Sequence, residues 1–114
     1  MFRRGFAASL TLTMLAGCSS MIQEGSVIQV RKDFGNGDYK QCIARADSAR
    51  RHFDENSPAA LDAELLFYKG QCLDFDGRKA EAEIFYERLA SKYPTTDWGL
   101  QAAARLKENR SKDK

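Results

Sequence analysis

Proline, histidine and β-branched residues are scarce in this chain of 114 residues. The two prolines are Pro58 and Pro94, valine is absent after Val30, and isoleucine then occurs only at Ile43 and Ile84. Alanine, leucine, phenylalanine and tyrosine supply most of the other apolar positions. Because proline interrupts helices and β-branched residues favour strands, this composition predicts an all-α fold.

The residue patterns of common catalytic and metal sites are also missing. The single histidine, His52, stands beside Arg50 and Arg51, where cationic charge suits a helix C-terminus. No HExxH motif, serine–histidine–aspartate order or glycine-rich phosphate loop is present. Asp74 and Asp76 flank an expected turn, where carboxylates cap helices. We therefore expect no enzyme activity, no catalytic or metal-binding residues and no cofactor, with a divergent enzyme as the least favoured alternative.

The first 17 residues have the organisation of a secretory signal peptide. Two arginines precede an apolar run at residues 6–15, which is too short for a bilayer span of about 20 residues. The small residues Ala16 and Gly17 follow, and then Cys18. This pattern resembles the lipobox of bacterial lipoproteins. The resemblance implies cleavage before Cys18 and covalent attachment of a diacylglycerol to its sulfur and a further acyl chain to its new amino group.

Two or more acyl chains hold a protein on a membrane stably, at roughly 0.8 kcal/mol per buried methylene. Ser19 and Ser20 follow the cysteine, and in Gram-negative lipoproteins an aspartate there retains the protein at the inner membrane. The resemblance therefore implies the periplasmic face of the outer membrane, if the source is Gram-negative. We expect residues 18–26 to be the acylated N-terminus and tether. An ordinary cleaved signal with an incidental cysteine is the alternative.

Removal of the signal changes the length and the charge of the chain. The mature part has 114 − 17 = 97 residues, enough for one small domain. The whole chain has 18 basic and 16 acidic residues, and two of the basic residues lie in the signal, so the mature part carries no net charge. It also lacks a basic stripe, an aromatic stacking platform and zinc-ligand spacing, and we expect no nucleic-acid partner.

Apolar residues at helical spacing predict five helical segments. Glycine turns separate the first two segments and the third from the fourth, with Asp38 and Ser57 as expected N-terminal caps. Thr95 or Thr96 is the expected cap of the last helix. We expect a helical domain at residues 27–108 and a charged tail at 109–114. The expected helices are about 21–34, 39–53, 59–75, 78–92 and 96–108.

The turn at Gly37 recurs at Gly77, which suggests helical hairpins in series. Residues 63–94 resemble a tetratricopeptide repeat, except that Lys69 stands where a leucine-like residue is usual. Residues 97–108 resemble the first helix of a further repeat, whereas residues 23–54 match poorly. The positions that carry the resemblance are Leu66, Gly70, Leu73, Gly77, Ala82, Tyr86, Leu89 and Pro94. Residues 82–106 are similar to the repeats of outer-membrane tetratricopeptide lipoproteins.

The resemblance implies a short solenoid whose concave groove binds a peptide or protein. The residues that it places in the groove are Glu64, Phe67, Gln71, Asp74, Trp98, Gln101 and Arg105. The poorer repeat adds Glu24, Val27, Arg31 and Phe34. The alternatives are that Phe67 belongs to the core, that Trp98 seals the end of the solenoid and that the charged members are only solvated.

Cys42 and Cys72 lie on apolar faces of the second and third expected helices. Export would place them in an oxidising compartment. A disulfide between them would close a loop of about 30 residues and stabilise the fold by roughly 3–4 kcal/mol. Two buried free thiols are the alternative.

The expected function is that of a lipid-anchored periplasmic interaction module, a scaffold, assembly or pilot factor of an envelope complex. The alternative is a regulator of cell-wall enzymes that acts through the same groove. Two and a half repeats are marginal for independent stability, so self-association is also an option.

Overall fold

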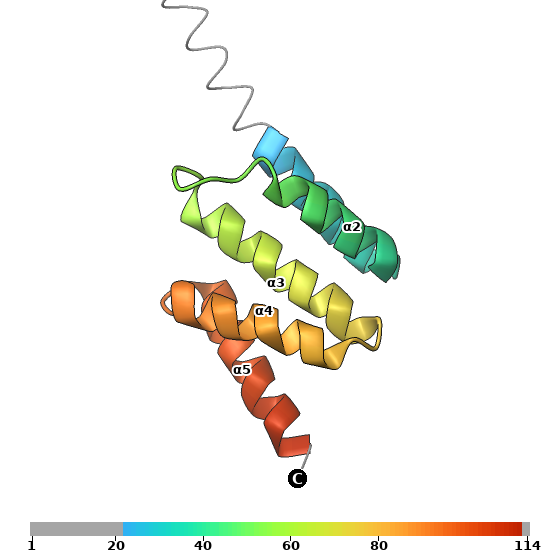
Figure 1. Cartoon of the computed structure of the whole chain (residues 1–114), viewed down its shortest axis with the longest axis vertical. Coiled ribbons are helices and arrows are strands. Elements are labelled where there is room, and N and C mark those ends of the chain that lie inside the picture. The colour runs from blue at the N-terminus through green and yellow to red at the C-terminus, as the bar shows by residue number, and fades with distance from the viewer. Residues whose placement is uncertain (1–21, 113–114) are drawn as a thin grey trace, which may run out of the picture.

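The computed structural model describes residues 22–112, and these residues form five helices and no strand (Figure 1). The prediction of an all-α fold of about five helices is confirmed. The first helix occupies residues 22–35. The others are α2 (Tyr39–Arg50), α3 (Ala59–Phe75), α4 (Lys79–Lys92) and α5 (Asp97–Lys112).

α3 is the central helix of the described residues. α3 packs against α2 and α4 and also contacts α5. The first helix lies against α3 as well, since Arg31 pairs with Glu64 and the rings of Phe34 and Tyr68 are 5.6 Å apart. The first helix and α5 therefore each lie against α3, and in Figure 1 they lie partly behind α2 and α4.

The two hairpins close with the same turn. Gly37 and Gly77 have φ angles of +78° and +82°, a region that glycine enters without steric cost. The amide that follows each glycine donates to the carbonyl five residues earlier: Asp38 to Asp33 at 2.9 Å, and Arg78 to Leu73 at 2.8 Å. These bonds satisfy carbonyls at the helix end. The expected turns at Gly37 and Gly77 are thus present.

Close contact between α3 and α4 depends on small residues. A Cβ atom placed on Gly70 would lie 2.6 Å from Cε1 of Tyr86, so only glycine admits the tyrosine ring at this distance. Ala82, on α4, is fully buried. The core of the described residues as a whole is apolar, and its largest fully buried side chains include Tyr86, Leu65, Leu66, Leu73, Leu89, Val27 and Val30.

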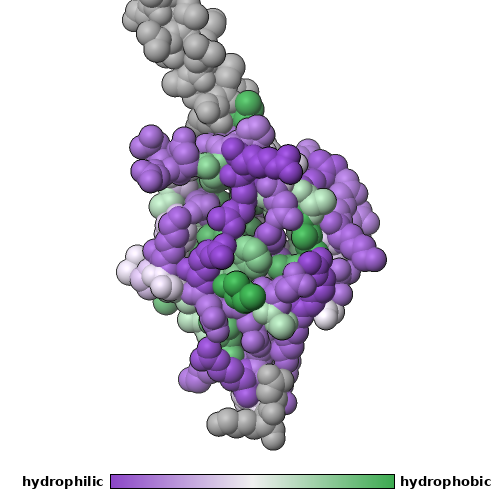
Figure 2. Space-filling view, viewed as in Figure 1, coloured by the Kyte–Doolittle hydropathy of each residue, from purple (hydrophilic) through white to green (hydrophobic). Residues whose placement is uncertain are grey.

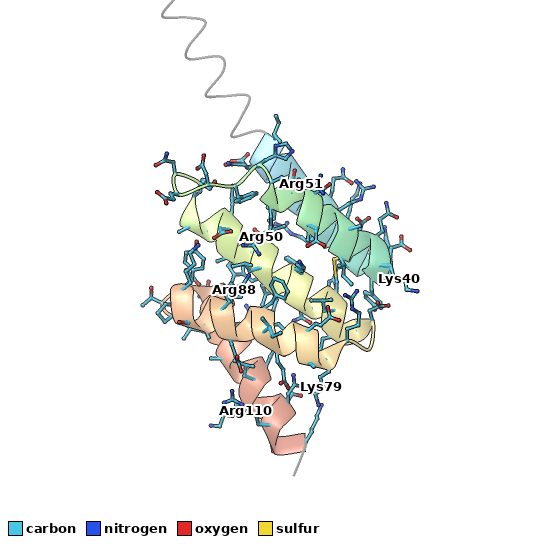
Figure 3. All side chains as sticks on the ribbon, in the orientation of Figure 1. Lys40, Arg50, Arg51, Lys79, Arg88 and Arg110 are labelled. Carbon is cyan, nitrogen blue, oxygen red and sulfur yellow. A yellow bond between two sulfur atoms is a disulfide. The ribbon has the colours of Figure 1, made fainter. Side chains whose placement is uncertain are left out.

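A disulfide joins α2 to α3. Cys42 and Cys72 are bonded, with their Cα atoms 6.3 Å apart, and both residues are fully buried. The bond is drawn in yellow between the two helices in Figure 3. The pairing that the sequence left open is therefore the one that the fold brings together.

Two expected caps differ from the structure. Asp38 and Pro58, not Ser57, stand at the N-cap positions of α2 and α3, and neither side chain caps its helix. The Ser57 hydroxyl instead accepts hydrogen bonds from the Asp54 amide at 2.8 Å and from Gln23 Nε2 at 3.1 Å. α3 begins at Ala59, with Pro58 at its N-cap position, so Ser57 belongs to the loop before the helix.

The expected cap of α5 is present, and it is Thr96. Its hydroxyl accepts a hydrogen bond from the Gly99 amide at 3.0 Å. A Cβ on Gly99 would lie 1.8 Å from the Tyr93 carbonyl oxygen, so the first turn of α5 requires glycine there. The sequence analysis did not single out Gly99.

Both ends of the helical domain extend beyond the expected bounds. Residues 22–26, assigned to the tether, are helical, and Gln23 is buried. α5 continues to Lys112, with Asn109 buried, although residues 109–114 were expected to be a tail. In both cases the buried residue is polar, and a pattern search for apolar residues does not detect it.

Candidate functional site

Aromatic side chains form a connected group across the first helix, α2, α3 and α5. The ring of Phe34 is 5.6 Å from that of Tyr68, which is 5.7 Å from Trp98, and Trp98 is 5.2 Å from Phe67. At the end that carries the glycine turns, Phe75 stacks on Tyr39 at 5.5 Å and meets Phe34 at 5.6 Å. We call this group the aromatic row; its members are Phe34, Tyr39, Phe67, Tyr68, Phe75 and Trp98.

Most of the aromatic row is accessible to solvent. Phe75 is 54% exposed, and Phe34, Tyr39, Tyr68 and Trp98 are half-buried. Large rings that keep one side in water and the other against the protein are the side chains that dominate binding energy in protein interfaces. The aromatic row can therefore contribute to recognition of another protein as well as to packing.

Charged groups border the aromatic row on both sides. On the first helix, Arg31 donates from Nε to the Glu64 carboxylate at 3.1 Å, and this pairing raises the pKa of Arg31. Next to Phe75, a cavity of about 270 Å³ opens between α3, α4 and α5. Its lining holds charges of both signs: Asp74, Phe75, Lys79, Arg105, Glu108, Asn109 and Lys112.

The face formed by α2, α3 and α4 has a different surface. Figure 2 shows the face over α2, α3 and α4 as mainly hydrophilic, with small separate apolar areas. Ile84 of α4 is 54% exposed, as Phe75 is. Tyr86, by contrast, is fully buried, and burial together with the Asp74 carboxylate raises the pKa of its hydroxyl.

Three of the predicted groove residues are buried, which corrects their assignment to an open groove. Glu64, Phe67 and Gln71 are only 8%, 5% and 4% exposed. The reason is that the first helix and α5 lie directly beside α3, so that Arg31 covers Glu64 and Trp98 covers Phe67. Substitution of Phe67 would disturb the core, as the core alternative anticipated.

The remaining predicted residues are distributed around these three. Asp74, Trp98 and Arg105 are half-buried, and Gln101 is exposed. In the first helix, Arg31 and Glu24 are exposed, Phe34 is half-buried and Val27 belongs to the core. Asp74 and Arg105 both line the cavity beside Phe75. Cys18 lies outside the described residues.

Tyr39, Tyr68 and Phe75 belong to the aromatic row but were not among the predicted site residues, since aromatic residues at helical spacing are equally typical of a buried helix face. Tyr68 and Phe75 are seven residues apart, which places them on one side of α3 two turns apart. That spacing is the signal that could have identified them. Which side of α3 faces water depends on the neighbouring helices, and the spacing does not contain this information.

Searches with protein-family models, among curated proteins and among solved structures returned no match for this chain. Within residues 22–112, no helix combines the length and the apolar character that a membrane crossing requires. The same residues contain no group of three or more histidine, cysteine, aspartate or glutamate side chains placed to hold a metal ion.

Proposed function

We propose that the protein is a lipid-anchored interaction module, held at a membrane through Cys18 and bound by another protein at the aromatic row. The lipobox-like residues 15–18 support the anchor. The aromatic row supports the interaction, and it is the observation that carries this proposal. A largely half-exposed group of rings that spans four helices, with Phe75 54% exposed, has the chemistry of a binding surface.

The repetition of the hairpin supports a tetratricopeptide-type array as the scaffold. The turns at Gly37 and Gly77 have the same backbone conformation and the same hydrogen bonds, 40 residues apart. Their first helices, residues 22–35 and α3, adjoin one another, and α3 in turn contacts α5, as successive repeats do in a solenoid. In this proposal α5 is the first helix of a further, incomplete hairpin.

The test is partner recovery from detergent-solubilised membranes. We expect Phe75→Ala to lower recovery of the partner several-fold, since a large ring leaves the surface without a change in the core. Ile84→Ala is the matched control, because Ile84 has the same 54% exposure but lies on α4. Circular dichroism must show that both variants are folded.

Equal recovery by the two variants would exclude the aromatic row as the binding surface. The identity of the recovered protein separates the two expected roles. Subunits of an envelope complex indicate a scaffold, assembly or pilot factor, and a cell-wall enzyme indicates a regulator.

A further inference from the structure

The described part of the first helix lies very close in sequence to the cysteine that would carry the lipid. Ile22 is already helical and stands four residues after Cys18. Four residues of chain span at most about 14 Å, even when fully extended. The start of the helix therefore lies within that distance of the lipid-bearing residue, whatever path the chain takes between them.

The loop between α2 and α3 is fixed to this end of the domain. Gln23 Nε2 donates hydrogen bonds to the His52 carbonyl at 2.9 Å and to the Ser57 hydroxyl at 3.1 Å. Gln23 is only 7% exposed, so these bonds are largely shielded from water. Figure 1 shows the loop beside the start of the first helix. The loop and the helix start thus form one continuous surface, which we call the anchor end: Ile22, Gln23 and residues 51–58.

The anchor end combines an apolar tip with charges of both signs. Ile22 is 50% exposed. Arg51 and His52 are exposed, and so are the acidic residues Asp54 and Glu55. Nearby Arg50 and Glu24 add one charge of each sign. Positive and negative groups of this kind match the phosphates and amines of phospholipid headgroups without requiring a net attraction.

The glycine turns lie at the opposite end of the helices. The described part of the first helix, residues 22–35, is about 21 Å long, so its far end and the Gly37 turn stand well away from Ile22. Figure 3 shows the same separation in α2, with Arg51 at the end near the helix start and Lys40 at the other. Phe75 and Tyr39 of the aromatic row belong to this far end.

We propose that the anchor end rests on the phospholipid headgroups of the membrane that holds the lipid, and that the glycine turns and Phe75 point into the aqueous compartment. This inference rests on the proposed anchor at Cys18. It places the partner of the aromatic row on the aqueous side, where a soluble domain or peptide reaches Phe75 without entering the bilayer.

Single labels at two matched positions test this orientation. Acylation of Cys18 and the Cys42–Cys72 bond occupy all three cysteines of the chain, so an introduced cysteine is the only free thiol. Asn56→Cys labels the anchor end and Asn36→Cys labels the turn at Gly37; both positions are exposed. The acylated proteins, each with an environment-sensitive fluorophore, are reconstituted into phosphatidylethanolamine and phosphatidylglycerol vesicles that contain doxyl-labelled lipid.

We expect several-fold stronger quenching by the doxyl lipid at position 56 than at position 36, equally at low and high salt. A protein that floats with the vesicles but is quenched equally at both positions, or more strongly at 36, overturns the orientation and leaves the anchor intact. A protein that does not float overturns the anchor and the orientation together. Addition of Cys18→Ser should abolish quenching at 56; if it does not, the lipid is not what brings this end to the membrane.

Discussion

The two hairpins share a turn but are stabilised differently. The second hairpin, α3 and α4, is held by close apolar packing, since Gly70 admits the Tyr86 ring and Ala82 is fully buried. In the first hairpin, Cys42 occupies the position that corresponds to Ala82, five residues after the turn glycine. Its sulfur is bonded covalently to Cys72 of α3. Polar contacts add to this attachment: Arg31 pairs with Glu64, and Asp47 with Lys69. The first hairpin is thus attached to α3 by a disulfide and ion pairs in addition to apolar packing.

Lys69 contacts both hairpins, through an ion pair with the first and an aromatic ring of the second. It occupies a position where the resembled family has a leucine-like residue, and its side chain is only 12% exposed. Its ammonium group pairs with Asp47 of the first hairpin and lies 4.3 Å from the centre of the Phe85 ring of the second. A lysine is accommodated there because one neighbour supplies a negative charge and the other an aromatic face.

Loss of the disulfide is expected to have the largest effect. Replacement of Cys42 and Cys72 by alanine should lower the free energy of unfolding by about 3–4 kcal/mol, since the bond closes a loop of about 30 residues. The loss should be uneven. In hydrogen exchange, amides of residues 22–50 should lose more protection than those of α4. Equal loss in both hairpins would contradict the proposed difference in attachment.

A methyl group at Gly70 tests the packing of the second hairpin. Gly70→Ala should cost about 1–3 kcal/mol, because its Cβ would overlap the Tyr86 ring and the core would have to shift. Gly25→Ala is the control: Gly25 is helical with no atom near its Cβ position, and alanine there should stabilise by up to about 1 kcal/mol. Urea unfolding measures both, and a stabilising Gly70→Ala would refute the close approach of the helices.

Because the two turns have the same backbone conformation, alanine should lower the free energy of unfolding equally at both turn glycines. Gly37→Ala and Gly77→Ala should each destabilise by about 1–2 kcal/mol, since both glycines have positive φ. Neither Cβ would meet another atom within 4 Å, so backbone strain is the only cost. Clearly unequal losses in the urea midpoints would show that the two turns are not equivalent.

The smallest effect concerns alkaline pH. Burial raises the pKa of Tyr86 and of Tyr93, and the carboxylates Asp74 and Asp62 add to it. In the unfolded chain these phenols ionise near pH 10, so the unfolded state releases protons first and stability falls as the pH rises above about 10. Tyr86→Phe should make this decline shallower in urea unfolding between pH 8 and 11. If the free energy of unfolding of Tyr86→Phe falls with pH as steeply as that of the unchanged protein, ionisation of Tyr86 does not contribute to the alkaline loss of stability.

Local patterns predicted much of the fold. The bounds of α3, the turns at Gly37 and Gly77 and the cap at Thr96 follow from residues that act within a few positions of themselves. Gly99 could not be found in this way, because its importance comes from the position of the Tyr93 carbonyl oxygen, 1.8 Å from the Gly99 Cβ position, which no residue pattern specifies.

The site was less predictable than the fold. The periodicity identified one side of α3, but burial of Glu64 and Phe67 depends on how closely the first helix and α5 lie beside it. The 54% exposure of Phe75 has the same origin, since Phe34 and Tyr39 of the neighbouring helices cover only part of its ring. Contacts between helices far apart in the sequence decide which members of a pattern reach solvent.

The intact mass of the protein extracted from membranes tests most directly whether a lipid anchor holds this domain. We predict a chain that begins at Cys18, carries the mass of a diacylglycerol and one further acyl chain, and has two hydrogens fewer than the fully reduced form. Treatment with a reductant should restore those hydrogens and leave the acyl chains in place. A mature chain without acyl chains, or one that begins elsewhere, would contradict the account.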